Sequence, residues 1–157
     1  MMPQANHNHA HCTAELISRA EQTCAKRGTR LTEQRKDILA SVAESHNAVG
    51  AYEIIERMAT GGGTRPAPIT IYRALDFLLA HDLVHKIESR NAYVACAGNH
   101  ANNQPTLLIC DHCGNVDEVI ESDTNASLQN TAANKHFAVN KTVIELSGTC
   151  HQCGVGS

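Results

Sequence analysis

The sequence predicts an α+β protein, with an N-terminal winged helix-turn-helix followed by a small α/β dimerisation domain that carries a four-cysteine zinc site. Two C-x-x-C pairs, at residues 110–113 and 150–153, are each followed by a glycine. Four segments with helical patterning precede two short strand-like runs, and this is the element order of a winged helix. The chain has 157 residues, which suits one domain or two small ones.

The distribution of charge also indicates two domains. Residues 1–90 contain 11 Lys and Arg against 10 Asp and Glu, a net charge of +1. Residues 91–157 contain 2 against 6, a net charge of −4. Only the first half therefore has the electrostatic character of a DNA-binding domain.

Bulk composition excludes several classes of protein. Hydrophobic residues make up 42% of the chain, enough for a core, and none of the apolar runs approaches the 18 residues of a membrane helix. The N-terminus is polar and His-rich, unlike a secretory signal. The seven cysteines are therefore expected to be reduced thiols and metal ligands in the cytosol, rather than disulfides.

Residues 1–12 are expected to be a flexible tail. It contains His7, His9, His11 and Cys12, so a third zinc site is the alternative interpretation.

Residues 13–96 are expected to form the winged helix. Thr13 and Thr32 are suitable N-caps and Gly28 a suitable helix stop, while Cys24 falls on an apolar helix face and is interpreted as core. The helices are expected over 13–27, 32–45, 51–60 and from Thr70 onwards. The wing strands are expected over 83–87 and 92–96, around a turn at 89–91.

A hinge loop, 97–105, is expected to lead into the dimerisation and zinc-binding domain, 106–157. Its predicted strands cover 106–109, 115–120 and 142–146, and its predicted helix covers 124–135. A β-α-β arrangement would place both cysteine pairs at one end of a small sheet. The open strand edges of such a sheet favour pairing with a second copy of the chain.

The two cysteine pairs predict a tetrahedral zinc site formed by Cys110, Cys113, Cys150 and Cys153. The two-residue gap within each pair lets both sulfurs reach one ion, and the following glycine permits the tight turn.

A second group of metal-ligand types remains: His85, Cys96, His100 and Glu118. Each has an ordinary alternative interpretation, as a solvated wing residue, a packed thiol or a surface charge. Together they come from both halves of the chain, so a metal bound by all of them would fix the angle between the halves. A mixed set of sulfur, nitrogen and oxygen suits Zn²⁺ better than Fe²⁺ or Mn²⁺.

Several motifs together resemble the ferric uptake regulator family, and within it the zinc-sensing branch. They are RLTEQR (30–35), AYEIIE (51–56), TIYRALDFLLAHDLVHKIES (70–89), YVAC (93–96) and ICDHCGNVDE (109–118). The resemblance covers roughly residues 13–154. It implies a homodimeric transcriptional repressor of zinc uptake genes that binds a palindromic operator in double-stranded DNA. It implies neither enzymatic activity, nor a small-molecule substrate, nor a membrane partner.

The resemblance also implies roles for particular residues. The four cysteines match a structural zinc site, and His85, Cys96 and Glu118 match a regulatory one, giving two Zn²⁺ per chain. His100 completes the regulatory set because the variable loop offers no other histidine. Tyr52, Thr70, Tyr72 and Arg73 are expected to contact DNA. Glu56 keeps an acid that in relatives joins neighbouring dimers, but Ala59 stands at the expected arginine position.

Three alternatives remain open at this stage. One keeps the fold and senses iron or peroxide instead of zinc. A second is a thiol redox enzyme, whose C-x-x-C motif would be expected in a thioredoxin-like βαβ context. A third is a zinc-ribbon interaction module without DNA specificity.

Overall fold

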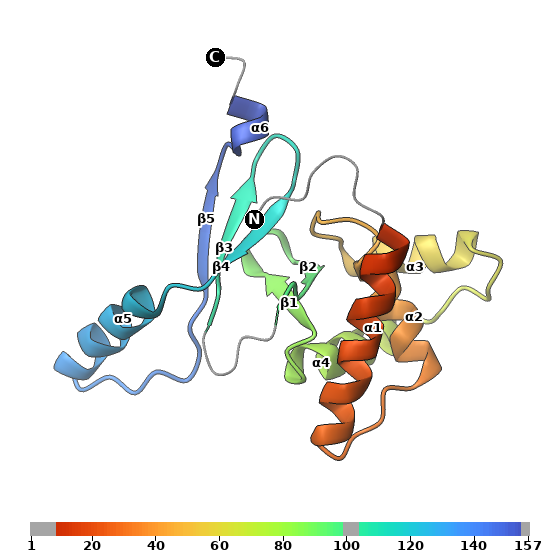
Figure 1. Ribbon diagram of the computed structural model, residues 1–157, viewed down its shortest axis with the longest axis horizontal. Helices are drawn as coiled ribbons and strands as arrows, with labels where there is room; N and C mark the ends of the chain where they lie inside the picture. Colours follow the sequence, from red (N-terminus) through yellow and green to blue (C-terminus); the bar gives the residue numbers. More distant parts are fainter. Residues whose placement is uncertain (1–8, 99–103, 155–157) are drawn as a thin grey trace. The chain divides into compact units, whose positions relative to one another are not determined.

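The computed structural model describes residues 9–98 and 104–154. The chain divides into two compact units, Met1–Ala97 and Gly98–Ser157. Figure 1 shows the order of their helices and strands along the chain. None of the helices within the described ranges is long and apolar enough to cross a membrane.

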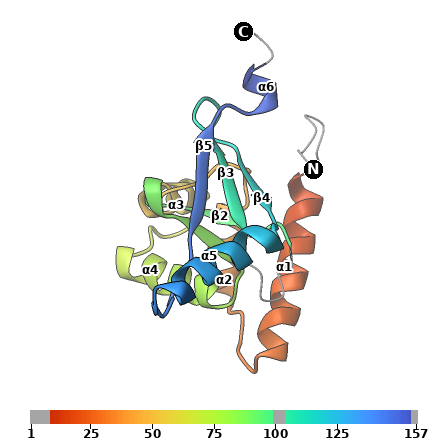
Figure 2. The same cartoon turned by 90° about the vertical axis from the view of Figure 1, so that its left-hand side faces the viewer.

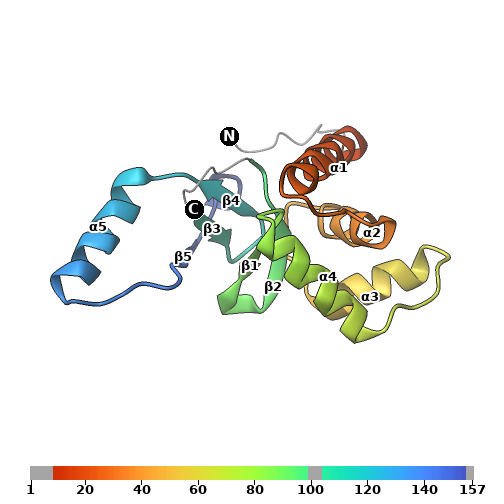
Figure 3. The same cartoon turned by 90° about the horizontal axis from the view of Figure 1, so that it is seen from below.

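The first unit contains four helices and a two-stranded wing, and Figure 3 shows helix α2 between α1 on one side and α3 and α4 on the other. The helices are α1 (His9–Lys26), α2 (Glu33–Val42), α3 (Ala51–Thr60) and α4 (Pro68–Ala80). Their apolar faces bury a shared core, whose largest members include Ile38, Leu39, Ile54, Ile55, Ile71, Leu75 and Leu78. This continuous core means that the first unit has substantial packing of its own, independent of metal.

Helix α1 begins earlier than predicted. The prediction of a flexible tail is wrong for residues 9–12, which are helical, and Thr13 is therefore not an N-cap. Nδ1 of His11 lies 3.4 Å from a carboxylate oxygen of Glu15, one turn away, and this i,i+4 pair favours the added turn. His7 lies outside the described residues. Cys24 is buried at 1% exposure, which confirms it as core.

Local signals predicted some of the remaining helix boundaries and missed others. Thr32 is confirmed as the N-cap of α2, since its hydroxyl accepts a hydrogen bond of 3.4 Å from the Arg35 N–H. Helix α2 ends at Val42, three residues before the predicted end. Helix α4 begins at Pro68 rather than Thr70, because proline is well tolerated in the first helical turn.

The wing is an antiparallel pair of strands, β1 (Val84–Ile87) and β2 (Ala92–Ala95). A short 3₁₀ turn, Glu88–Arg90, joins them, and Asn91 completes the reversal with φ +47°. Asparagine tolerates this left-handed conformation better than most residues. Backbone hydrogen bonds of 2.8 Å between Val49 and Tyr93 fasten the wing to the segment before α3.

The second unit is a three-stranded sheet with a helical crossover, seen from the side in Figure 2. Its elements are β3 (Thr106–Cys110), β4 (Val116–Val119), α5 (Ser122–Asn134), β5 (Ile144–Gly148) and the short α6 (His151–Gly154). The strand order is β4-β3-β5, with β3 antiparallel to β4 and parallel to β5. The sequence did not predict α6.

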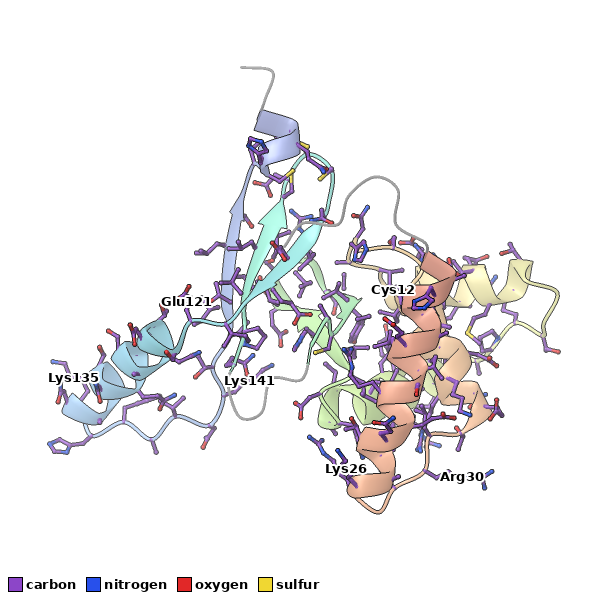
Figure 4. The ribbon with its side chains drawn as sticks, viewed as in Figure 1. Cys12, Lys26, Arg30, Glu121, Lys135 and Lys141 are labelled. Carbon is purple, nitrogen blue, oxygen red and sulfur yellow. The ribbon has the colours of Figure 1, made fainter. Side chains whose placement is uncertain are left out.

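Helix α5 extends away from the sheet, and Glu121 and Lys135 mark its two ends (Figure 4). All 13 of its residues are described and none of them is buried. Large apolar side chains are exposed across this unit: Leu108, Ile120, Leu128, Phe137, Val143 and Leu146. So much exposed apolar surface on a small unit is typical of a protein–protein interface.

Candidate metal sites and nucleic-acid interface

The four predicted cysteines meet in the second unit. The sulfurs of Cys110, Cys113, Cys150 and Cys153 all lie within 4.8 Å of one another. Figure 4 shows sulfur atoms gathered between the β3–β4 turn and α6. The sulfurs of Cys113 and Cys150 are 3.7 Å apart. Four thiolates that bind zinc at about 2.3 Å require sulfur separations of about 3.8 Å, so this cluster fits a tetrahedral zinc ion.

The parallel pairing of β3 with β5 brings the two cysteine pairs together. Cys110 ends β3 opposite Gly148, so Cys150 lies just beyond the same end of the sheet. The Asp111 N–H donates to the Gly148 carbonyl at 2.8 Å, which ties the first turn to the second strand. Gly114 has φ +74°, a conformation that favours glycine, and this confirms why a glycine follows the first pair.

Hydrogen bonds within the sulfur cluster shift the pKa values of two of its thiols in opposite directions. The Cys150 N–H donates to the sulfur of Cys110 at 3.4 Å. Hydrogen bonds from the backbone of Cys113 and Cys150 lower the pKa of the Cys110 thiol to about 5. Hydrogen bonding to Cys150 and Cys113 instead raises the pKa of Cys153 to about 12. One sulfur is therefore prepared as a thiolate at neutral pH, whereas another retains its proton until a cation displaces it.

Two further side chains of metal-binding type, those of His85 and Cys96, lie close together at the wing. His85 lies on β1 opposite Val94, and Cys96 follows β2 directly, so the two are diagonal neighbours on one face of the hairpin. A ring nitrogen of His85 and the sulfur of Cys96 lie within 4.8 Å of each other. Cys96 is buried, with 2% exposure. An imidazole beside a buried thiol is a suitable pair of zinc ligands.

The other two predicted members of this group belong to the second unit. Glu118 lies on β4, opposite Leu107 of β3, and its side chain is half-buried. His100 lies outside the described residues. The regulatory ligand set predicted from the sequence therefore remains a prediction.

Arg19 supports the chain beside Cys96, a role that the sequence analysis missed. From α1, its guanidinium donates to the Cys96 carbonyl at 2.5 Å and to the Ala97 carbonyl at 3.2 Å. Both acceptors are backbone atoms almost 80 positions away, so residue types alone gave no signal for the contact. The one clue in the sequence was that Arg19 lies three residues after Leu16, beside the buried face of α1.

The residues predicted to contact DNA lie on α3 and α4. Tyr52 is 66% exposed in the first turn of α3, and Tyr72 is 37% exposed on α4. Arg73 is also exposed, whereas Thr70 is half-buried. The opposite face of α4 is buried in the core, so α4 presents one face to solvent while its other face packs against the rest of the first unit. This arrangement suits a recognition helix for the major groove.

Together these features define a class: a winged-helix protein with a second, α/β unit whose four clustered cysteines are suited to hold a metal ion. The family model described as "Ferric uptake regulator family" matches residues 26–147. The chain belongs to this family.

Within the family, the chain is similar to proteins named for zinc. It is 39% identical to the zinc uptake regulation protein of Escherichia coli K12 over 145 residues, which is 90% of this chain and 82% of the relative. The solved structure described as a zinc uptake regulator complexed with zinc and DNA is 37% identical, with a TM-score of 0.84, covering 90% of this chain and 94% of that one. The crystal structure of holo XcZur is 35% identical, with a TM-score of 0.83, covering 92% of this chain and 99% of that one.

Proposed function

We propose that this chain is a zinc-responsive transcriptional regulator. As a zinc-loaded homodimer, it represses genes for zinc uptake by binding a palindromic operator. The observation that carries this proposal is the pairing of the Cys96 sulfur with the His85 imidazole at the base of the wing. The similarity to zinc uptake regulators of known structure supports it.

The proposal assigns two zinc ions to each chain. Cys110, Cys113, Cys150 and Cys153 hold the structural ion, because four thiolates form a closed site that suits a permanent metal. His85, Cys96, His100 and Glu118 hold the regulatory ion. A buried sulfur in this set favours zinc over Fe²⁺ and Mn²⁺, for which nitrogen and oxygen ligands suffice.

DNA recognition is assigned to the exposed faces of α3 and α4. Tyr52, Thr70, Tyr72 and Arg73 contact the operator, with α4 in the major groove and the wing beside it. Arg73 is able to donate two hydrogen bonds to O6 and N7 of a guanine, a contact worth about 1–3 kcal/mol of discrimination.

The homodimer is assigned to the second unit. Strand β5 is an edge of its sheet, and Leu146 on that strand is 56% exposed. Phe137, in the segment between α5 and β5, is 67% exposed. An open edge flanked by apolar side chains is stabilised by a second copy of the same surface, and two-fold symmetry then matches a palindromic operator.

Thermodynamic linkage couples the regulatory zinc to DNA. Zinc favours the arrangement that binds the operator, so zinc raises operator affinity and the operator raises zinc affinity by the same factor. A coupling free energy of about 1–3 kcal/mol corresponds to a change of roughly 5–150-fold.

A metal-competition experiment tests this function against the iron-sensing or peroxide-sensing alternative. Operator binding is followed by fluorescence anisotropy in buffered free Zn²⁺, Fe²⁺ or Mn²⁺, with the four-cysteine site already loaded. Activation by Zn²⁺ at the lowest free concentration supports the proposal. Activation by Fe²⁺ or Mn²⁺ at lower free concentrations than Zn²⁺ would overturn the zinc assignment.

A further inference from the structure

Ile69, the second residue of α4, projects an aliphatic side chain into solvent. It is 58% exposed. Three other exposed residues follow it at helical spacings of three, four and seven: Tyr72, Arg73 and Asp76. Ile69 therefore begins the same solvent-facing stripe of α4 that carries two of the residues assigned to DNA.

The packing of the fold gives no reason for isoleucine at this position. The neighbouring Ile71 is fully buried in the core, but Ile69 lies on the opposite face. Isoleucine is a weaker helix former than many polar residues. Pro68, directly before it, has its own φ fixed near the helical value, which favours the start of α4 at this point.

A single exposed isoleucine is ordinary on a protein surface. Ile69 differs because it lies at the start of α4. The N-terminal residues of a recognition helix contact base edges in the major groove. An aliphatic side chain cannot hydrogen-bond to a base. The apolar group that the major groove presents is the C5-methyl group of thymine.

We propose that Ile69 is a specificity-determining residue that selects thymine in the operator through its C5-methyl group. The inference rests on the proposed function and extends it to one base of the recognition sequence. Arg73 lies about one helical turn further along the same face, so the guanine and this thymine fall within the same half-site.

Replacing single thymines with deoxyuridine tests the contact, because this change removes only the methyl group. The duplex is one selected by the zinc-loaded protein from random sequences, and each thymine is replaced symmetrically in both half-sites. Loss of one buried methyl contact costs about fourfold in affinity, hence about 16-fold for a dimer on a palindrome. We expect this loss with the wild-type protein at one thymine position.

The variant Ile69→Ala should lose a similar factor on the thymine duplex and should bind the thymine and deoxyuridine duplexes equally. Ile69→Val retains branched methyl groups and should keep most of the discrimination. Zinc content and affinity for non-specific DNA should be the same in all three proteins.

The inference is wrong if the wild type is insensitive to deoxyuridine at every position, or if Ile69→Ala keeps the wild-type preference for thymine. Either result, obtained with a duplex that the zinc-loaded protein does select, leaves the proposed function intact. Failure to select any defined duplex would overturn the proposed function and this inference with it.

Discussion

In the proposed function, the choice of metal depends on the sulfur of Cys96. The backbone places it diagonally across the wing from the His85 imidazole, and packing buries it almost completely. A thiolate binds zinc far better than an alcohol of similar size does. Replacing this sulfur with oxygen should therefore impair metal sensing and leave the fold intact.

Replacing Cys96 with serine should abolish zinc-dependent operator binding while the dimer and the four-cysteine zinc persist. Each chain should fall from two zinc ions to one, measured by mass spectrometry of the native protein. Cys24→Ala is a matched control, because Cys24 is a buried thiol of the same unit but lies in the apolar core. Two zinc ions and an unchanged response in Cys96→Ser would show that Cys96 is not a ligand.

Arg19 should act as a positioning residue for the same sulfur. Hydrogen bonds from a charged group are worth about 1.5–3 kcal/mol each when they are well formed, and Arg19 makes two to the chain at Cys96 and Ala97. Arg19→Ala should weaken zinc binding at the regulatory site about tenfold. This is less than the full free energy of the two hydrogen bonds, because only part of it is expected to affect the position of the Cys96 sulfur. Competition with a chelator gives the affinity.

Cobalt substitution supplies a second measurement for Arg19. The thiolate-to-Co²⁺ absorption of the regulatory site should shift in Arg19→Ala and should recover in part in Arg19→Lys, which keeps the positive charge and hydrogen-bond donors on one nitrogen. An unaltered spectrum together with lowered global stability would mean that Arg19 only stabilises the fold.

At the scale of helices and strands, local chemistry predicted every element except α6, with several boundaries displaced by one to four residues. Thr32 was expected to cap α2 and does so, and the glycine after the first cysteine pair was expected in a tight turn and adopts one. The errors have physical causes. A polar, His-rich start hid the first turn of α1, and the proline that opens α4 was interpreted as part of the preceding loop.

The candidate site was less predictable than the elements that carry it. Sequence spacing was sufficient for the four cysteines, because each pair is local and the pairs have few alternatives. The contact of Arg19 with two distant carbonyls depends on how α1 packs, and the exposure of Ile69 depends on which face of α4 is buried. Both are tertiary properties that a list of residue types does not contain.

The cap of α2 provides a test at this scale. Thr32→Ala should lower the free energy of unfolding by about 1 kcal/mol, because the Arg35 N–H loses its side-chain acceptor. Urea unfolding of the full chain measures the change. Thr32→Ser keeps the hydroxyl and should remain within a few tenths of a kcal/mol of the wild type. An equal loss in both variants would assign the effect to the lost methyl group.

For the whole molecule, the two units differ in how their apolar side chains are buried. The first unit has a broad apolar core, whereas the second exposes much of its apolar surface and gathers its metal ligands at one end of a sheet. In the proposed function, the structural zinc ion and a second copy of the chain stabilise the second unit. Loss of the structural zinc should therefore reduce dimerisation before it unfolds the winged helix.

Acidification should release the structural zinc. The metal-free cluster keeps a proton on Cys153, whose pKa is raised to about 12, so zinc binding at neutral pH displaces protons and its affinity falls as pH falls. Below about pH 5 the Cys110 thiol also becomes protonated. Zinc retention and sedimentation, measured together from pH 8 to pH 4, should show metal loss and dimer dissociation in parallel. A dimer that survives complete zinc loss would separate the two properties.

The most direct test of the central claim follows operator binding and bound zinc together as free zinc is varied. The claim predicts a protein with one zinc per chain that binds the operator weakly, and a second zinc that raises operator affinity by roughly 5–150-fold. The operator should raise the affinity for the second zinc by the same factor. Equal operator affinity with one and with two zinc ions per chain would contradict the account.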